Sequence, residues 1–363
     1  MMSGLESVIA AETVLSDVDG EAGRLVIRGH SLDELVGHRR YEDVLALLWA
    51  DLFPQSLDGE GLAAELGAAR DRVFREGLAS GVSRIDRPLI DIVRSLMARL
   101  GDGSDLRTAL SLASAPGVFV PAAIRLKSGL EPVPPDARCS HAADLLRMVS
   151  GEMPDDARVA ALDRYLVTAS DHGLNASTFT ARVIASTQAG LTSAIVGALC
   201  ALKGPLHGGA PGPVLDMLDD IHDVERARPW LEAALSRGER LMGFGHRIYR
   251  VRDPRADAVK GALARLIDSG GVDVARLRLA QAVESAALEA LARHKPGRVL
   301  EVNLEFYTAL LLEALGFPRD AFTCVFAASR VGGWIAHARE QALRGRLIRP
   351  QSRYVGPRPR EMA

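Results

Sequence analysis

Apolar residues recur at three- and four-residue spacing in segment after segment of this chain. The pattern is clear in residues 42–52, 62–74, 91–100 and 157–168, and again in a long stretch over residues 321–343. Such spacing gathers apolar side chains on one face of an α-helix, where they can be buried together. Alanine and leucine, both strong helix formers, are abundant. The sequence therefore predicts a mainly α fold.

Strand signals are few. Residues 23–29 form a short run with β-type residues between two glycines, which predicts a strand. Residues 17–20, with two aspartates and a glycine, predict a turn just before it. The proline-rich residues 131–135 predict only a surface loop, and no internal repeat or low-complexity linker divides the chain.

The composition is that of an ordinary globular protein of 363 residues, with 48% hydrophobic and 25% charged residues. A formal net charge of -2 gives no bulk attraction to nucleic acid or to an anionic membrane. Cys139, Cys200 and Cys324 are too far apart for a CxxC metal site and fit no disulfide framework. The N-terminus lacks the features of a secretion signal. We therefore expect a cytoplasmic protein with no bound metal and no nucleic-acid partner.

One uncharged stretch, residues 183–202, is long enough to be tested as a membrane span. Serine, threonine, glutamine and glycine residues dilute it, and Gly190 predicts a break between two helices. We interpret the stretch as a buried helix pair, whose small residues permit close helix approach, and not as a membrane segment.

The first segment that can carry chemistry is residues 203–212. Its glycines and prolines cannot continue a helix, so it predicts a loop that displays His207. The next helix is predicted over residues 214–218, and its N-terminal amides could face an anion. The alternative is a tight turn between helices with an incidental histidine.

The second segment, residues 242–255, combines glycines, His246 and four arginines. Asp253 is a natural N-cap, and Pro254 suits the first helical position. Arg255 would then lie in the first turn, near the loop that holds His246. Clustered arginines suit bidentate capture of a carboxylate or phosphate. A solvated basic loop is the alternative.

The third segment, residues 302–310, places Glu305 at the start of an apolar helix. An acid in a first turn is commonly just a favourable partner of the helix dipole. Two smaller features accompany it. His172 follows a predicted helix, and Arg330 lies within the long apolar helix, where a guanidinium needs a partner. Arg349, near the C-terminus, is by default a solvated charge.

Taken together, a carboxylate, two histidines and several arginines are what a carbon–carbon condensation requires. The carboxylate can take a proton from the methyl group of a thioester. One histidine can stabilise the charge on the thioester oxygen, and the second can polarise the acceptor carbonyl. Arginines can hold a dicarboxylate in reach. The sequence motifs of serine hydrolases, zinc proteases and dinucleotide-binding dehydrogenases are absent.

These segments resemble the citrate synthase family, of the short bacterial and archaeal type. The similarity runs in order and nearly end to end, over residues 4–25, 171–178, 204–210, 243–247, 329–337 and 348–357. The resemblance implies a mainly α, two-domain homodimer. Residues 1–205 and 311–363 would form a large helical domain, and residues 206–310 a small domain that carries the catalytic loops. Closure of the small domain would exclude water until condensation is complete.

The resemblance also implies catalytic roles. His207 would hydrogen-bond the thioester oxygen, and His246 would polarise the keto group of oxaloacetate. Glu305 stands where the family pattern Asn-x-Asp has its proton-abstracting aspartate. Glutamate is one methylene longer but is also a carboxylate, with a reference pKa within about half a unit of that of aspartate.

Binding roles follow from the same resemblance. Substrate carboxylates would be bound by His172, Arg255, Arg330 and, from the partner subunit, Arg349. CoA would be contacted by Met242, Gly243, Phe244, Gly245 and Arg250. The CoA thioester is a substrate, and the resemblance implies no cofactor.

The implied reaction is the condensation of acetyl-CoA with oxaloacetate to citrate and CoA. Alternatives remain open at this point. A 2-methylcitrate synthase would use propionyl-CoA, because one methylene is discriminated by only about 10–200-fold. The same residues could support cleavage of citryl-CoA. A catalytically weak or silent paralogue that binds CoA or a dicarboxylate is a third alternative, because Glu305 replaces the usual aspartate.

Overall fold

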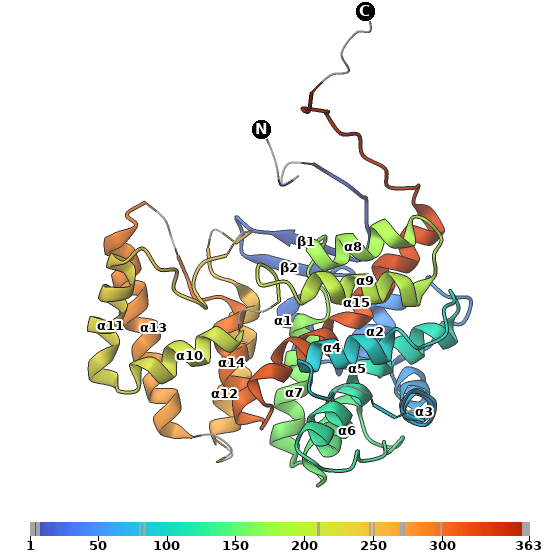
Figure 1. Cartoon of the computed structure of the whole chain (residues 1–363), viewed down its shortest axis with the longest axis horizontal. Helices are drawn as coiled ribbons and strands as arrows, with labels where there is room; N and C mark the ends of the chain where they lie inside the picture. Colours follow the sequence, from blue (N-terminus) through green and yellow to red (C-terminus); the bar gives the residue numbers. More distant parts are fainter. Residues whose placement is uncertain are drawn as a thin grey trace, which may run out of the picture.

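The computed structural model describes residues 4, 8–79, 81–82, 85–208, 211–246, 248–249, 251–268, 270, 273–297 and 300–357. This part of the chain is mainly helical, as predicted (Figure 1). In chain order the elements are β1 (Ser16–Asp19), β2 (Arg24–Ile27), β3 (His30–Ser31), α1 (Leu32–Leu35), α2 (Tyr41–Trp49), α3 (Gly59–Leu78), α4 (Leu89–Met97), α5 (Leu106–Lys127), α6 (His141–Ser150), α7 (Asp156–Ala169), α8 (Ala176–Ala185), α9 (Leu191–Leu202), α10 (Pro211–Ile221), α11 (Val224–Ser236), α12 (Pro254–Asp268), α13 (Val274–His294), α14 (Leu304–Ala314), η1 (Arg319–Ala321) and α15 (Phe322–Arg344).

The segments with the clearest helical spacing all form helices, namely α2, α3, α4, α7 and α15. The helix ends differ from the predicted ones by a few residues because capping side chains set them. Asp58 accepts a hydrogen bond from the Gly61 amide and starts α3 at Gly59. Asp155 does the same for α7 through the Arg158 amide.

The turn predicted at residues 17–20 is wrong. Ser16–Asp19 is strand β1, paired antiparallel with β2 so that Asp17 faces Val26, and the tip of the hairpin lies at residues 20–23. The Asp19 carboxylate accepts hydrogen bonds from the amides of Glu21 and Ala22. The aspartate thus closes a turn that follows it, because its side chain bonds backbone two and three residues on. The strand predicted over residues 23–29 is confirmed as β2.

The uncharged stretch of residues 183–202 is a buried helix pair, as predicted. Its residues belong to α8 and α9, which pack against each other, and Gly190, at φ 95°, starts α9. Among the described residues, the helix that is long and apolar enough to cross a membrane is α5, and most of it is buried inside the protein. It is therefore a core helix by its surroundings.

Helix α15 runs through the middle of the helical body (Figure 1) and is buried along most of its length. It packs against α2, α5, α7, α8 and α9. Helix α2 is fastened to it by two side chains. Tyr41 Oη donates toward the carbonyls of Ala328 and Ser329, and Trp49 Nε1 donates to the Gly332 carbonyl. These bonds hold α15 on both sides of Arg330, at residues 328–329 and at residue 332.

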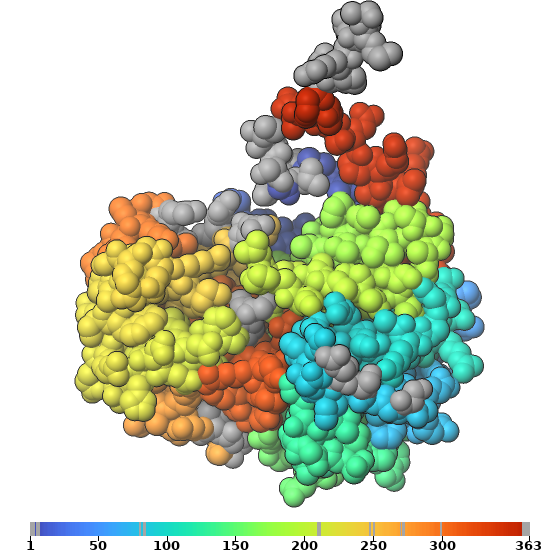
Figure 2. All heavy atoms as spheres, viewed as in Figure 1, coloured from blue at the N-terminus to red at the C-terminus, as the bar shows by residue number. Residues whose placement is uncertain are grey.

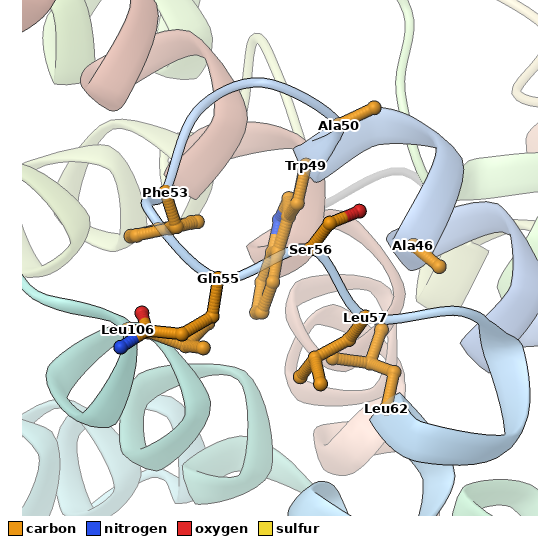
Figure 3. Close-up of a pocket in the computed structure, with 9 residues that line it drawn as sticks. All are labelled: Ala46, Trp49, Ala50, Phe53, Gln55, Ser56, Leu57, Leu62 and Leu106. Carbon is orange, nitrogen blue, oxygen red and sulfur yellow. The ribbon is translucent and has the colours of Figure 1, made fainter.

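Helices α10, α11, α12 and α13 gather on one side of the molecule (Figure 1), where Figure 2 shows their yellow and orange atoms. Helix α10 begins at Pro211, earlier than predicted, because proline tolerates the first turn, where its missing N–H has no helical partner. A small pocket lies elsewhere, between the ends of α2 and α3 (Figure 3), and is lined by Ala46, Trp49, Ala50, Phe53, Gln55, Ser56, Leu57, Leu62 and Leu106. That lining contains none of the histidines or arginines expected to act.

Candidate active site

His172 and His246, far apart in the sequence, meet in the fold. Their ring centroids lie 5.8 Å apart with the rings nearly perpendicular. Tyr249 links the two, because its hydroxyl lies 3.1 Å from His172 Nε2 and its ring centroid 4.8 Å from that of His246. His172 is buried at the end of the turn that follows α7. The two imidazoles therefore share one pocket.

The backbone sets the tautomer of His246. The amides of Ile248 and Tyr249 both donate to His246 Nδ1 at 3.0 Å, so the ring proton of the neutral imidazole must sit on Nε2. Burial, followed by the charge of Arg255, lowers the pKa of His246 to about 4. His246 Nε2 lies 3.0 Å from Arg255 Nη2, which can only donate. With the ring proton on Nε2, the two nitrogens are both donors and cannot hydrogen-bond each other, so a substrate oxygen that accepts from both would relieve the contact.

Arg255 is held in place by Asp253. Arg255 Nε lies 3.0 Å from Asp253 Oδ1, and Arg255 Nη2 lies 2.8 Å from Oδ2. As predicted, Pro254 starts α12, and the Asp253 carboxylate caps it by accepting from the Arg255 amide. Burial alone would lower the pKa of Arg255, but Asp253 raises it above its ordinary value. The guanidinium is therefore a fixed, fully charged group.

The loop before His246 is pinned to the start of α14. Phe244 and Val302 form an antiparallel bridge, and the Gly245 amide donates to the Glu301 carbonyl at 2.8 Å. Asn303 completes the link, because its amide donates to the Gly243 carbonyl and its Nδ2 donates to the Gly245 carbonyl, both at 2.9 Å. Because of these bonds, His246 and the first turn of α14 cannot move independently.

Glu305 occupies that first turn. Its amide donates to Asn303 Oδ1, the N-cap of α14, at 3.1 Å. Its Oε2 atom is buried and has no hydrogen-bond partner among the described residues. Burial raises the pKa of Glu305, although the charge of Arg255 acts against the rise. A carboxylate that is buried, unpaired and more basic than usual is suited to accepting a proton.

His207 lies in the loop between α9 and α10. The Ser177 amide donates to His207 Nε2 at 3.3 Å, so the ring proton lies on Nδ1. Ser177 Oγ lies 2.8 Å from the same nitrogen and accepts from Trp334 Nε1 of α15 at 3.1 Å. Burial, followed by the charge of Arg330, lowers the pKa of His207 to about 4. The neutral ring therefore has one fixed donor, Nδ1–H, available for another group.

Arg330 extends from α15 into the same region. Its Nε donates to the Ala169 carbonyl at 2.6 Å, while its Nη2 is buried without a partner in the part of the chain that the structure describes. Burial lowers the pKa of Arg330 to about 10. The pKa of His172 lies well below its usual range, because of burial and then the charges of Arg255 and Arg330. Two guanidinium groups and three imidazoles thus lie close enough together to affect one another's ionisation.

The whole chain can be compared with known proteins. Residues 4–351 match the family model described as citrate synthase, C-terminal domain. The chain belongs to the citrate synthase family. It is 38% identical to the citrate synthase of Haloferax volcanii, over 97% of this chain and 95% of that protein. The citrate synthase family resemblance expected from the sequence is therefore confirmed, and with it the enzyme class, an acyltransferase.

Solved citrate synthase structures share the fold. The citrate synthase of Thermotoga maritima matches with a TM-score of 0.87 and 32% identity, over 100% of this chain and 98% of that one. A ternary complex of Thermoplasma acidophilum citrate synthase with carboxymethyl coenzyme A and oxaloacetate matches with a TM-score of 0.85 and 27% identity, over 99% and 97% of the two chains. The mainly α, citrate synthase-like fold is thereby confirmed.

The remaining predicted residues fall outside this constellation. Phe244 is buried, with its ring centroid 5.4 Å from that of Phe306, so its side chain belongs to the core. Gly243 and Gly245 adopt positive φ angles of 86° and 76°, which glycine tolerates without strain. Met242 is half-buried beside them. Arg250 lies outside the described residues, and Arg349 is exposed on the C-terminal segment, which leaves the helical body (Figure 1).

Three side chains that the sequence did not single out hold the candidate site residues in place. Tyr249 joins His172 to His246, Ser177 holds His207, and Asn303 ties the His246 loop to α14. Each lies within six residues of a predicted site residue. The sequence could have pointed to these three residues because each has a hydroxyl or amide group near a predicted histidine or carboxylate. Sequence spacing does not show, however, which partner such a group contacts.

We predict that His172, His207 and His246 are all neutral at pH 6. The pKa values of His207 and His246 are about 4, whereas unfolded histidine titrates near 6.5, so unfolding takes up protons between these values. These groups therefore stabilise the fold less as the pH falls from about 6.5 to about 4. Imidazole nitrogen chemical shifts measured from pH 8 to 5 should stay those of the neutral ring, with the urea-unfolded chain as the titrating control. A native titration midpoint above pH 6 for any of the three rings would contradict the prediction.

Proposed function

We propose that this protein condenses acetyl-CoA with oxaloacetate to give citrate and CoA, in the cytoplasm. One observation carries the proposal. The Glu305 carboxylate, whose Oε2 is buried and unpaired among the described residues, lies close enough to Arg255 to feel its charge, and Arg255, Arg330, His207 and His246 all act on His172. The name of the Thermoplasma acidophilum complex supports the same pair of substrate types, because it holds a CoA derivative and oxaloacetate.

The free donors of the site favour a dicarboxylate. The three imidazoles are neutral, and the carboxylates of Asp253 and Glu305 offset the charges of Arg255 and Arg330, so hydrogen-bond donors and not net charge distinguish the site. The buried Arg330 Nη2 has no acceptor among the described residues, and Arg255 Nη2 faces Nε2 of His246. Carboxylate and keto oxygens would satisfy these donors, because buried donors without acceptors are costly.

The condensation can then be written on the residues present. Glu305 takes a proton from the methyl group of acetyl-CoA, and the electron pair moves to the thioester oxygen, where His207 Nδ1–H donates a hydrogen bond. The resulting enolate carbon attacks the keto carbon of oxaloacetate, whose oxygen is polarised by His246 Nε2–H and Arg255. That oxygen becomes the hydroxyl of citryl-CoA, with a net transfer to it of the proton that Glu305 removed. Water then cleaves the thioester of citryl-CoA, which releases citrate and CoA.

The domain arrangement, the CoA contacts and the homodimer are proposed from the resemblance to the citrate synthase family. Residues 206–310 would form a small domain that closes on a large domain of residues 1–205 and 311–363, and so exclude water. The backbone of residues 242–245, together with Arg250, would bind CoA. The exposed Arg349 would enter the site of a partner subunit in a homodimer, because its segment extends away from its own helical body (Figure 1).

The decisive experiment is a panel of acyl-CoA thioesters with oxaloacetate, followed by the release of free CoA. We expect acetyl-CoA to give the highest kcat/KM, because its methyl group is the smallest donor. A higher value with propionyl-CoA would instead identify a 2-methylcitrate synthase. Tight oxaloacetate binding without any CoA release would support the silent paralogue. CoA release from citryl-CoA alone would support the cleavage reaction.

Glu305→Gln is expected to lower kcat by at least about a hundredfold while leaving oxaloacetate affinity unchanged, because only the base is removed. Glu305→Asp is the matched variant. Since Asn303 fixes the backbone at Glu305, the shorter side chain falls about 1 Å short, which can cost roughly a hundredfold in rate. Steady-state kinetics with both substrates measure both effects. Full activity of Glu305→Gln would remove this residue from the mechanism.

The partner role of Arg349 predicts complementation between inactive subunits. Arg349→Ala and Arg330→Ala homodimers should each be inactive, because every site lacks one arginine. Randomly mixed subunits should regain about a quarter of wild-type activity, because half the dimers would hold one complete site. Activity after unfolding and refolding the mixture measures this, with each variant refolded alone as control. No recovery in mixtures shown by mass to be dimeric would contradict the exchange.

A further inference from the structure

A chain of buried polar side chains lies directly behind His172. It runs from Asp171 through His337 to Arg182 and Glu340, and the exposed fractions of these four residues are 0%, 0%, 1% and 4%. Asp171 precedes His172 in the sequence, whereas His337 and Glu340 come from α15 and Arg182 from α8. The proposed reaction uses none of these four groups, so their burial needs another explanation.

Hydrogen bonds from Arg182 set the tautomer of His337. Its Nε and Nη2 atoms lie 3.0 Å and 2.9 Å from His337 Nδ1, and a guanidinium can only donate. His337 Nδ1 therefore accepts, and the ring proton sits on Nε2. Asp171 Oδ1 lies 3.1 Å from His337 Nε2, an ion-pair contact that does not meet hydrogen-bond geometry. Both atoms are buried and have no hydrogen-bond partner among the described residues, so the Nε2–H and the carboxylate oxygen interact electrostatically with each other.

Arg182 cannot easily turn away, because its remaining donors are engaged. It donates to Gln341 Oε1 at 3.0 Å, to Thr13 Oγ1 at 3.2 Å and to the Glu340 carboxylate. Glu340 in turn accepts from the Val14 amide at 3.0 Å. These hydrogen bonds hold the Arg182 guanidinium toward His337. The guanidinium in turn sets which ring nitrogen of His337 carries the proton and faces Asp171.

The other oxygen of Asp171 shapes the turn that carries His172. Asp171 Oδ2 accepts from the Gly173 amide at 3.2 Å and from the Ser16 hydroxyl. These bonds close the backbone on both sides of His172, at a point where Gly173 has a φ of 55°. Burial would raise the pKa of Asp171, but His337 and Ser16 lower it, so the carboxylate is charged. The His172 ring leaves this turn toward Tyr249 and His246.

The backbone of helix α15 packs directly against the turn at residues 170–173, because Gly333 has no side chain to separate them. A Cβ atom on Gly333 would lie 2.4 Å from the Ser170 carbonyl oxygen and 2.8 Å from Asp171 Oδ1. Gly333 precedes His337 by one helical turn, so both face the turn at residues 170–173. A side chain larger than glycine at position 333 would therefore displace this turn, and with it the Asp171 carboxylate.

We propose that His337 is a positioning residue for oxaloacetate binding. Its Nε2–H holds the Asp171 carboxylate, and that carboxylate holds the turn that aims His172 at the substrate. The proposal rests on the proposed function for the identity of its substrate, oxaloacetate. The structural link from His337 to His172 does not depend on that function.

Two isosteric variants separate the two nitrogens of His337. His337→Asn keeps an acceptor near Nδ1 for Arg182 but loses the donor that reaches Asp171. His337→Gln places an amide N–H near Nε2 and keeps that donor. We expect His337→Asn to raise the KM for oxaloacetate by at least about tenfold, with the KM for acetyl-CoA unchanged. His337→Gln should stay within about threefold of wild type.

Glu340→Gln is the matched control, because it alters the same buried chain beyond Arg182: its one amide oxygen can accept from Arg182 or from the Val14 amide but not from both, while Gln341 and Thr13 still hold Arg182. It should leave the KM for oxaloacetate unchanged. Thermal unfolding of all three variants shows whether destabilisation alone explains the kinetics. Equal KM increases in His337→Asn, His337→Gln and Glu340→Gln would overturn the proposal, because a general destabilisation of this buried cluster would then explain all three. Should His337→Asn not fold, Asp171→Asn is expected to give the same selective increase, and a normal KM there would overturn it too.

Hydrogen exchange of the backbone at residues 170–175 gives a readout that needs no substrate. It should quicken in His337→Asn and remain at the wild-type rate in His337→Gln. Unchanged exchange in His337→Asn would contradict the positioning role whatever the enzyme catalyses. Wild-type protein that neither binds oxaloacetate nor releases CoA would overturn the proposed function instead, while the exchange data would still decide the role of His337.

Discussion

The close approach of helix α15 to the turn after α7 is the constraint on which the site depends. Two consecutive glycines, Gly332 and Gly333, let the helix backbone lie against Leu45 on one face and against Ser170 and Asp171 on another. Close packing of this kind tolerates no added methyl group without displacement of backbone. The approach places Arg330, Trp334 and His337 on the side of α15 that faces the site.

Those three side chains reach three different segments. Arg330 bonds the Ala169 carbonyl, Trp334 supports Ser177, and His337 faces Asp171. Their spacing of four and three residues is the spacing that keeps side chains on one face of a helix. One buried helix thus sets the positions of His172 and His207 together, although neither histidine lies on it. A shift of α15 would therefore move both imidazoles at once.

The second half of the site is organised by a different contact. The short pairing between residues 243–245 and 301–303 joins His246 to Glu305, and Asn303 supplies both a backbone link and the helix cap. The electrostatics follow from burial. The imidazoles are kept neutral and can serve as directional donors, while Glu305 becomes more basic. Guanidinium groups alone carry the positive charge, which suits capture of an anion by groups that do not titrate near neutral pH.

The sequence by itself determined the helical class, the main helices and the types of group in the site. Helical periodicity is local, and so are the signals of Asp253 as a cap, of Pro254 at a helix start and of glycines around His207 and His246. The same locality explains the error at residues 17–20: pairing with β2 puts Asp17 in a strand, and the turn that the Asp19 carboxylate closes lies just after it. Only the tertiary structure decided which groups meet. The ring proton of His246 depends on two backbone amides, that of His337 on an arginine from another helix, and the basicity of Glu305 on burial. Such properties belong to the surroundings of an atom, and residues distant in the sequence supply most of those surroundings.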